Sequence, residues 1–254
     1  MLNPDDCAAA REYDVIVHLA AHLDKSPDAA ELVFRTNVEG TVNLLRSVRP
    51  NAVFIFASTK DVYGRFADNY AKIPESCPTV YSGQSALEWS KLIAERYVDY
   101  YASQNSFRSC IFRLSKVYAP PTPGNTPNFV GNFAEAIDKG ERLVLPGAGI
   151  PKRDVMHVDD FSRACRAFVD SAIGHGLYNI GGGLDNALSL KEILMKLESV
   201  SGLQAVIDES KVLPNPVPIN YVTDLNLVTQ ELGWKPEVTI ENGFRTLFGQ
   251  AGEL

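Results

Sequence analysis

Three short, almost entirely apolar segments alternate with helix-like segments in the first half of the chain, and this alternation constrains the fold more than any other feature. The apolar segments are DVIVHLAA (14–21), AVFIFAST (52–59) and SCIFRLSKVYA (109–119). Runs this continuous, without polar alternation, are typical of strands that are buried on both faces. Helical patterns over 31–48 and from Ser85 separate them. The order predicts a doubly wound α/β fold, a parallel sheet with helices on both sides.

The second half of the chain has a different texture and is predicted to form a smaller domain. A Pro-rich segment, PPTPGNTPN (120–128), is followed by shorter helical and extended patterns. We expect residues 1–119 to form the larger domain, with a return segment at about 154–181. Residues 120–254 are expected to form the smaller, interleaved domain.

Composition and charge argue against several classes of protein. Of the 254 residues, 45% are hydrophobic and 22% are charged, so the chain can bury a full core. Its net charge of −7, with 24 basic residues scattered among 31 acidic ones, argues against a nucleic-acid groove. The four cysteines form no CxxC motif, so we expect reduced thiols and no metal site. No segment approaches about 18 apolar residues or resembles a signal peptide, so we expect no membrane span and a cytoplasmic location.

Two glycine-containing segments share only the outline of a phosphate-binding turn. YNIGGGLDNALSLKEIL (178–194) runs from strand to glycines to helix, but Asn186 stands where the third glycine belongs. Its helix begins later, at a capping box formed by Ser189 and Glu192. GAGIPK (147–152) departs from the same pattern. Both segments are therefore predicted to be turns, and the sequence contains no glycine turn that cradles a phosphate.

Polar side chains near the ends of predicted strands are candidates for a site. ASTKDVYG (57–64) leaves a strand with Ser58 and Thr59 at its carboxyl end, where ligands bind in open α/β sheets. PKRDVMHVDD contributes Arg153, whose guanidinium can pair with a phosphate, ahead of two aspartates that more simply cap the next helix. Each residue alone favours a structural interpretation, but together they favour a site.

The helix from Ser85 carries a further pair of candidates. Ser85 and Glu88 form a capping box, which places Leu87 and Lys91 one turn apart on one face of the helix. Taken alone, Lys91 is most simply a solvated helix lysine, Glu88 a cap and Leu87 a packing residue.

In this order, the segments resemble the extended short-chain dehydrogenase/reductases, specifically the NAD-dependent epimerase/dehydratase group that acts on nucleotide sugars. The resemblance implies a Rossmann-type fold, an NAD or NADP cofactor and a nucleotide-sugar substrate. It also implies hydride transfer coupled to proton abstraction at a sugar hydroxyl. Seven segments in register carry it: HLAA (18–21), TNVEGT (36–41), FIFASTKDVYG (54–64), WSKLIAE (89–95), FRLSKVYAP (112–120), KRDVMHVDD (152–160) and LGWKP (232–236).

The resemblance also implies roles for individual residues. Thr59 would be the catalytic hydroxyl, and Lys91 the active-site lysine that lowers the pKa of a neighbouring tyrosine and holds the nicotinamide ribose. Arg153 would hold the substrate diphosphate, and Asn37 would be a structural asparagine. The expected cofactor contacts are Leu19, Ala20, Ala21, Lys91 and Val117, and the expected substrate contacts are Thr59, Lys116 and Arg153.

The sequence departs from the family pattern at the catalytic tyrosine. The alignment places Leu87 at that position, and a leucine cannot carry a proton, a loss that costs about 10²–10⁴-fold in rate. Tyr81, ten residues before Lys91, would replace it only if its loop folds back, and Glu88 and His157 are weaker substitutes. The alternative is a catalytically impaired relative that serves as a nucleotide-sugar binding or partner module.

The sequence also begins where the third strand of the family would end. The first β-α-β unit, on the order of 60 residues with its glycine turn, has no counterpart here, so we expect weakened NAD binding. The strand at 14–21 is then an exposed apolar sheet edge. A homodimer through helices at 31–48 and 85–103 is a further implication. An oxidoreductase acting on a substrate without a diphosphate is a third hypothesis.

Overall fold

The main sheet is parallel, as the apolar segments predicted. The computed structural model of the chain describes residues 1–124 and 128–250. Four strands follow the order β1-β2-β3-β7 and pair in parallel register. They are β1 (Val15–His18), β2 (Val53–Thr59), β3 (Arg108–Leu114) and β7 (His175–Ile180).

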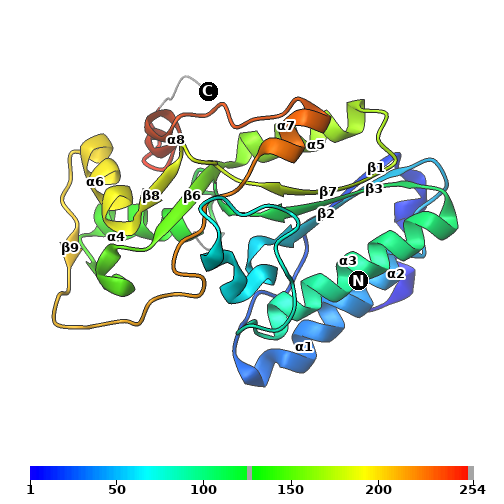
Figure 1. Ribbon diagram of the computed structural model, residues 1–254, viewed down its shortest axis with the longest axis horizontal. Helices are drawn as coiled ribbons and strands as arrows, with labels where there is room; N and C mark the ends of the chain where they lie inside the picture. The colour runs from blue at the N-terminus through cyan, green and yellow to red at the C-terminus, as the bar shows by residue number, and fades with distance from the viewer. Residues whose placement is uncertain (125–127, 251–254) are drawn as a thin grey trace.

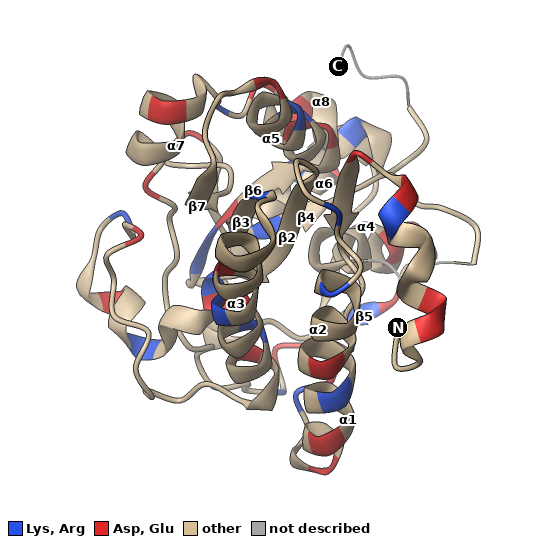
Figure 2. Ribbon diagram, turned by 90° about the vertical axis from the view of Figure 1, so that its right-hand side faces the viewer, with Lys and Arg blue, Asp and Glu red and all other residues tan. Residues whose placement is uncertain are grey.

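Helices cover both faces of this sheet, which confirms the α/β class (Figure 1). The helical pattern over 31–48 forms one rod with a π-helical turn in its middle. One face is covered by α1 (Ala30–Phe34), η3 (Arg35–Glu39), α2 (Gly40–Leu45) and α3 (Ala86–Asn105), and the other by α5 (Val158–Asp170) and α7 (Asn226–Leu232). In Figure 2, where α2 and α3 lie in front of the sheet, acidic and basic residues are interspersed.

A second group of elements packs around its own hydrophobic cluster. Its sheet joins β4 (Lys116–Tyr118), β6 (Lys152–His157) and β8 (Ala187–Ser189), with β4 parallel and β8 antiparallel to β6. A small parallel pair joins β5 (Arg142–Leu143) to β9 (Val206–Ile207). The helices around these strands are α4 (Phe129–Lys139), α6 (Leu190–Ser201) and α8 (Ile240–Thr246). Short helices η1 (Pro4–Glu12), η2 (Pro27–Ala29), η4 (Lys60–Asn69) and η5 (Gly147–Gly149) complete the described chain.

Both predicted capping boxes are present. The Ser85 N–H donates to Glu88 Oε2 at 2.6 Å, and the Ser189 N–H donates to Glu192 Oε2 at 2.7 Å. Because these bonds satisfy amides at the helix starts, they fix where α3 and α6 begin. The start of α3 in turn sets which residues of that helix face the sheet.

The glycines after β7 form a close-packed turn. A Cβ atom on Gly181 would collide with the side chains of Asp154 and Thr223, and one on Gly182 with the carbonyl of Val155. These glycines therefore allow strand β7 to approach β6, which is a packing role. This confirms the prediction of a turn.

Strand β1 is the edge of the described sheet and exposes apolar side chains. Val15 and Val17 are more than a third exposed, as the sequence predicted for an edge strand. Within residues 1–124 and 128–250, no helix is both long and apolar enough to cross a membrane.

A buried polar network ties α3 to the main sheet. Arg113 on β3 forms an ion pair with Glu95 on α3, with Nη2 to Oε2 at 2.7 Å and Nε to Oε1 at 3.0 Å. Ser58 donates to the same carboxylate at 2.5 Å, and Arg113 also donates to the Tyr63 hydroxyl at 2.9 Å. Because both charges are almost fully buried, the pair depends on this complete set of hydrogen bonds.

Replacing Glu95 by Ala is expected to lower the free energy of unfolding by about 3–5 kcal/mol, because Arg113 would remain buried without a carboxylate. Urea unfolding followed by circular dichroism would measure it. The matched control is Glu39→Ala, which removes an exposed i,i+4 partner of Arg35 and is expected to cost less than about 1 kcal/mol. Equal losses in the two variants would contradict this account of the network.

Candidate active site

Thr59 lies at the carboxyl end of β2 and starts the following short helix. Its Oγ1 accepts a hydrogen bond from the Asp61 N–H at 3.2 Å, and its backbone is extended. The neighbouring Ser58 hydroxyl is committed to Glu95. The two hydroxyls therefore differ: Ser58 belongs to the buried network, and Thr59 stands at the end of the strand.

Lys91 reaches from α3 to the same end of β2. Its Nζ donates to the Ala57 carbonyl at 2.7 Å and lies 4.8 Å from the centre of the Phe56 ring. The residue is only 5% exposed, so it is not a solvated helix lysine. Burial lowers the pKa of Lys91 to about 8, because Glu95 only partly offsets the loss of water. The structure thus brings Lys91 and the end of the strand that carries Thr59 together.

Leu87 stands one turn before Lys91, and its side chain is 7% exposed. The proposed substitutes for a tyrosine lie elsewhere or are engaged. Tyr81 is 70% exposed, so its loop leaves the side chain in solvent. Glu88 is buried as the cap of α3, and His157 starts α5 with its ring against Tyr118 at 5.3 Å.

The segment that follows β1 is held by Asn37. Its side chain accepts from the His22 N–H at 2.7 Å, donates to the His22 carbonyl at 3.0 Å, and donates to Ser90 Oγ at 2.9 Å. These bonds give Asn37 the structural role that the resemblance implied. Directly after β1, Leu19 is 56% exposed, Ala20 is exposed and Ala21 is partly exposed.

His18, the last residue of β1, is buried and neutral. Its Nε2 lies 2.9 Å from Thr41 Oγ1, and burial lowers the pKa of His18 to about 4, with a smaller contribution from Lys91. A neutral imidazole here adds no second positive charge beside the lysine.

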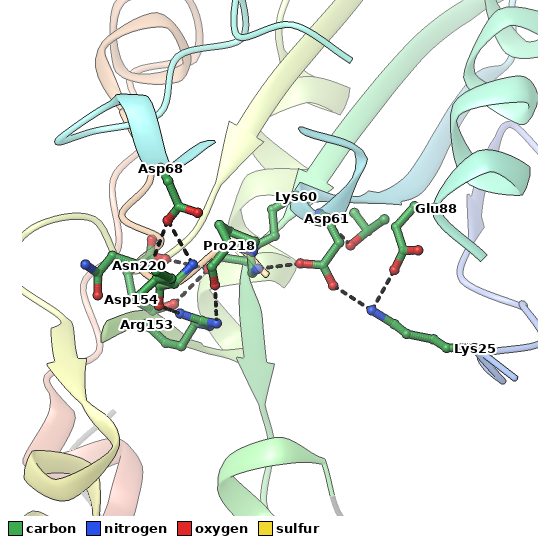
Figure 3. Close-up of polar contacts among 12 residues, drawn as sticks. Lys25, Lys60, Asp61, Asp68, Glu88, Arg153, Asp154, Pro218 and Asn220 are labelled. Carbon is green, nitrogen blue, oxygen red and sulfur yellow. Dashed lines mark hydrogen bonds and ion pairs between the residues drawn. The ribbon is translucent and has the colours of Figure 1, made fainter. Parts of the chain in front are cut away.

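Charged residues from three segments gather around Asp61 (Figure 3). Lys60 donates to Asp61 Oδ1 at 2.5 Å, and its ammonium lies 4.4 Å from the centre of the Tyr221 ring. Asp61 Oδ2 lies 3.1 Å from Lys25 Nζ, which in turn lies 2.6 Å from Glu88 Oε1. The sequence analysis missed this cluster, although its signal was present: Lys60 and Asp61 directly follow the candidate hydroxyl.

Burial and neighbouring charges shift the pKa values of Lys60 and Asp61. Burial lowers the pKa of Lys60 to about 8, although Asp61 opposes that shift. Burial also raises the pKa of Asp61, but Lys60, Lys116 and Lys25 outweigh it and hold that pKa well below the usual range. Asp61 is therefore ionised at neutral pH.

Two further cations come from the second sheet. Lys116, the first residue of β4, lies with its ammonium 5.6 Å from the Phe129 ring, and Val117 beside it is partly buried. Arg153 on β6 is 5% exposed and donates to the carbonyls of Pro218 at 2.8 Å and Ile219 at 2.7 Å. Burial lowers the pKa of both cations.

Lys91, Lys116 and Arg153 have one property in common. In the part of the chain that the structure describes, none of the three forms an ion pair with a carboxylate, although Lys25 and Lys60 do. No group of three or more His, Cys, Asp or Glu residues in that part is placed to hold a metal ion. Because the three cations lack carboxylate partners, they can bind an anion, and a lysine among them can hold or move a proton.

The sequence of this chain is similar to those of known proteins. A model of the NAD dependent epimerase/dehydratase family matches residues 2–181. The dTDP-glucose 4,6-dehydratase of Mycobacterium tuberculosis (strain ATCC 25618 / H37Rv) is 31% identical over 244 residues, covering 92% of this chain and 71% of the relative. The CDP-paratose 2-epimerase of Salmonella typhi is 28% identical over 260 residues, covering 92% and 77%.

Solved structures show the same fold. The UDP-glucose 4-epimerase of Thermotoga maritima, solved with UDP-glucose, has a TM-score of 0.81 at 23% identity, with 98% of this chain and 81% of that one covered. RMD from Pseudomonas aeruginosa, complexed with NADPH, has a TM-score of 0.83 at 21% identity, with 98% and 84% covered. With the order of strands and the seven segments, these matches show that the chain belongs to the NAD-dependent epimerase/dehydratase family of extended short-chain dehydrogenase/reductases.

Proposed function

We propose that this chain binds a nucleotide sugar together with NAD or NADP and transfers hydride and proton at a sugar hydroxyl. The observation that carries this proposal is the set of buried or partly buried cations without carboxylate partners, Lys91, Lys116 and Arg153. Burying an unpaired charge is costly, and a bound anion offsets that cost. A nucleotide sugar supplies such an anion in its diphosphate.

The relatives support this choice of substrate class. The similar enzymes are named for dTDP-glucose and CDP-paratose, and a solved neighbour was crystallised with UDP-glucose. All three are sugars joined to a nucleoside diphosphate. We propose that Arg153 and Lys116 contact that diphosphate, because guanidinium and ammonium groups form charge-assisted hydrogen bonds with phosphate oxygens.

The cofactor proposal rests on Lys91 and the end of β1. Lys91 donates one N–H to the Ala57 carbonyl, so two N–H donors of its ammonium remain for ribose hydroxyls. The exposed Leu19 and Ala20, with Ala21 and Val117, offer apolar contact for a ring system. When bound there, a nicotinamide supplies the hydride acceptor. We further propose that these 254 residues alone bind it weakly, since their sequence has no glycine-rich turn at a helix N-terminus for the pyrophosphate.

Within the proposed site, Thr59 orients the sugar hydroxyl through its own hydroxyl. Its Oγ1 accepts from Asp61, which leaves the Thr59 O–H free to donate to a substrate oxygen. Leu87 contributes only apolar contact. The position that carries a tyrosine in the family therefore holds no proton-transfer group in this chain.

Replacing Leu87 by Tyr is expected to raise the single-turnover rate of NAD reduction, because it supplies a phenol one turn from Lys91. Absorbance at 340 nm with excess dTDP- or UDP-glucose measures this rate. The matched control is Leu87→Phe, which adds a ring of similar size without a hydroxyl. An equal gain in the Phe variant would show that the effect comes from packing and would contradict the proposed role of the position.

Replacing Lys116 by Met is expected to weaken binding of dTDP or UDP by about tenfold or more, because a charge-assisted hydrogen bond to phosphate is lost. Isothermal titration calorimetry measures the dissociation constant. Lys196→Met, which removes an exposed lysine on α6, is the matched control and should leave the constant unchanged. A chain that binds no nucleotide would refute the substrate class, and one that binds sugar nucleotide but never NAD would favour the binding-module alternative.

We also propose that the chain forms a homodimer through α1, α2 and α3. Support comes from large apolar side chains that remain exposed on this face. Replacing Tyr100 by Glu is expected to shift the chain to monomer in sedimentation velocity, because a buried interface disfavours an unpaired charge. A monomeric unmodified chain would contradict this proposal. The exposed residues on α1 and α3 are Leu32, Phe34, Tyr97 and Tyr100.

A further inference from the structure

The proposed reaction needs a group that accepts and returns the proton of a sugar hydroxyl, and Leu87 is not one. We propose that in this chain Lys91 itself is that group, acting as general base and acid. This inference rests on the proposed function and names a catalytic role that differs from the electrostatic and ribose-binding role implied by the family resemblance.

At the end of β2, the contacts of Tyr63 and Lys60 leave neither group free to act as a base. Tyr63 is buried, donates to Asn179 at 2.6 Å and accepts from Arg113, and burial raises the pKa of Tyr63 to about 12. Lys60 is held by Asp61 at 2.5 Å and covered by the Tyr221 ring.

Two further groups near Lys91, Glu88 and His18, are also engaged. Glu88 is tied to Lys25 at 2.6 Å and to the start of α3, and His18 is bonded to Thr41. Lys91, by contrast, has one acceptor, the Ala57 carbonyl.

The surroundings of Lys91 stabilise both of its protonation states. The ionisable groups whose charge reaches it are Glu95, on its own helix, and His18, on β1. Strand β2 contributes the Ala57 carbonyl and the Phe56 ring, which favour the ammonium. Burial favours the neutral amine, and Leu87, one turn away, adds no polar group to oppose it.

The proposed step balances as follows. The neutral amine of Lys91 takes the proton from the sugar O–H and becomes an ammonium, while the carbinol C–H leaves as hydride to an oxidised nicotinamide. The sugar carbon is oxidised by two electrons to a carbonyl, and the nicotinamide is reduced by the same two electrons. In the return step the ammonium gives its proton to the carbonyl oxygen as hydride comes back to carbon. A pKa near the working pH makes both directions accessible.

The first test measures the ionisation of Lys91 without any cofactor. The ε-carbons of the lysines are labelled with ¹³C and titrated by NMR, and the Lys91 signal is assigned by its loss in Lys91→Arg. A midpoint near pH 8 is expected, from burial. A midpoint near the ordinary lysine value of about 10.4 would overturn the proposal, because too little neutral amine would exist near neutral pH.

The second test uses the rate of single-turnover NAD reduction. Because the neutral amine is the base, the rate of the unmodified chain should rise with pH through about 8 and fall below it. Lys91→Arg keeps the charge and the donors but cannot release a proton, so its rate should drop by about 10²–10⁴-fold. In the Leu87→Tyr background the same Lys91→Arg change should cost much less, because the tyrosine then carries the proton.

The outcomes separate this inference from the proposed function. A Lys91→Arg chain as fast as the unmodified one, or a rate independent of pH from 6.5 to 9.5, would show that Lys91 acts only by its charge. Turnover by Leu87→Tyr but none by the unmodified chain would also refute the lysine as base, while the proposed function stands. If neither chain turns over and neither binds a nucleotide sugar, the proposed function itself fails.

Discussion

The buried ion pair between Glu95 and Arg113 is the interaction on which the site depends. It fixes α3 against β3. Because Lys91 lies one helical turn before Glu95, the same contact places the lysine at the end of β2. Removing two charges from water is expensive, and the pair is stable only because Ser58 and Tyr63 complete its hydrogen bonds. A helix held by apolar packing alone would slide more easily, whereas these directional bonds fix its register on the sheet.

The cations around the end of β2 fall into two groups, which differ in whether a carboxylate of the chain neutralises them. Lys25 and Lys60 are neutralised by the chain's own carboxylates, and Asp61 joins segments that are far apart in sequence. Arg153 and Lys116 face carbonyls or an aromatic ring instead. Neutral partners stabilise a buried cation less than a carboxylate does, so the second group keeps a net attraction for oxyanions. The unpaired group therefore suits ligand binding, and the paired group suits structure.

What could be predicted from the sequence reflects the range over which each interaction acts. The strands, the turn at Gly181 and the capping boxes at Ser85 and Ser189 depend on local pattern or on residues three apart, and the structure contains them. The alignment of family segments predicted the end of β2 and Lys91 as one site, and these two lie together. The pairing of Glu95 with Arg113 and the bonds of Lys25 to Asp61 and Glu88 were missed, because they join residues brought together only by the fold.

If position 87 corresponds to the catalytic tyrosine of the family, as we propose, leucine there has two effects that act in opposite directions on catalysis: it removes a proton carrier, and it changes the surroundings of Lys91. A tyrosinate one turn away would stabilise the ammonium and raise the pKa of Lys91, keeping it a fixed charge. A leucine removes that anion, so burial, which Glu95 only partly offsets, decides the balance and the neutral amine becomes accessible near neutral pH. The proposed substitution thus removes one proton carrier at position 87 and makes proton transfer by the neighbouring Lys91 more accessible. Because a lysine becomes cationic where a tyrosinate becomes neutral on accepting a proton, such a site would hold a positive base after the transfer, whereas the family's base would then be neutral.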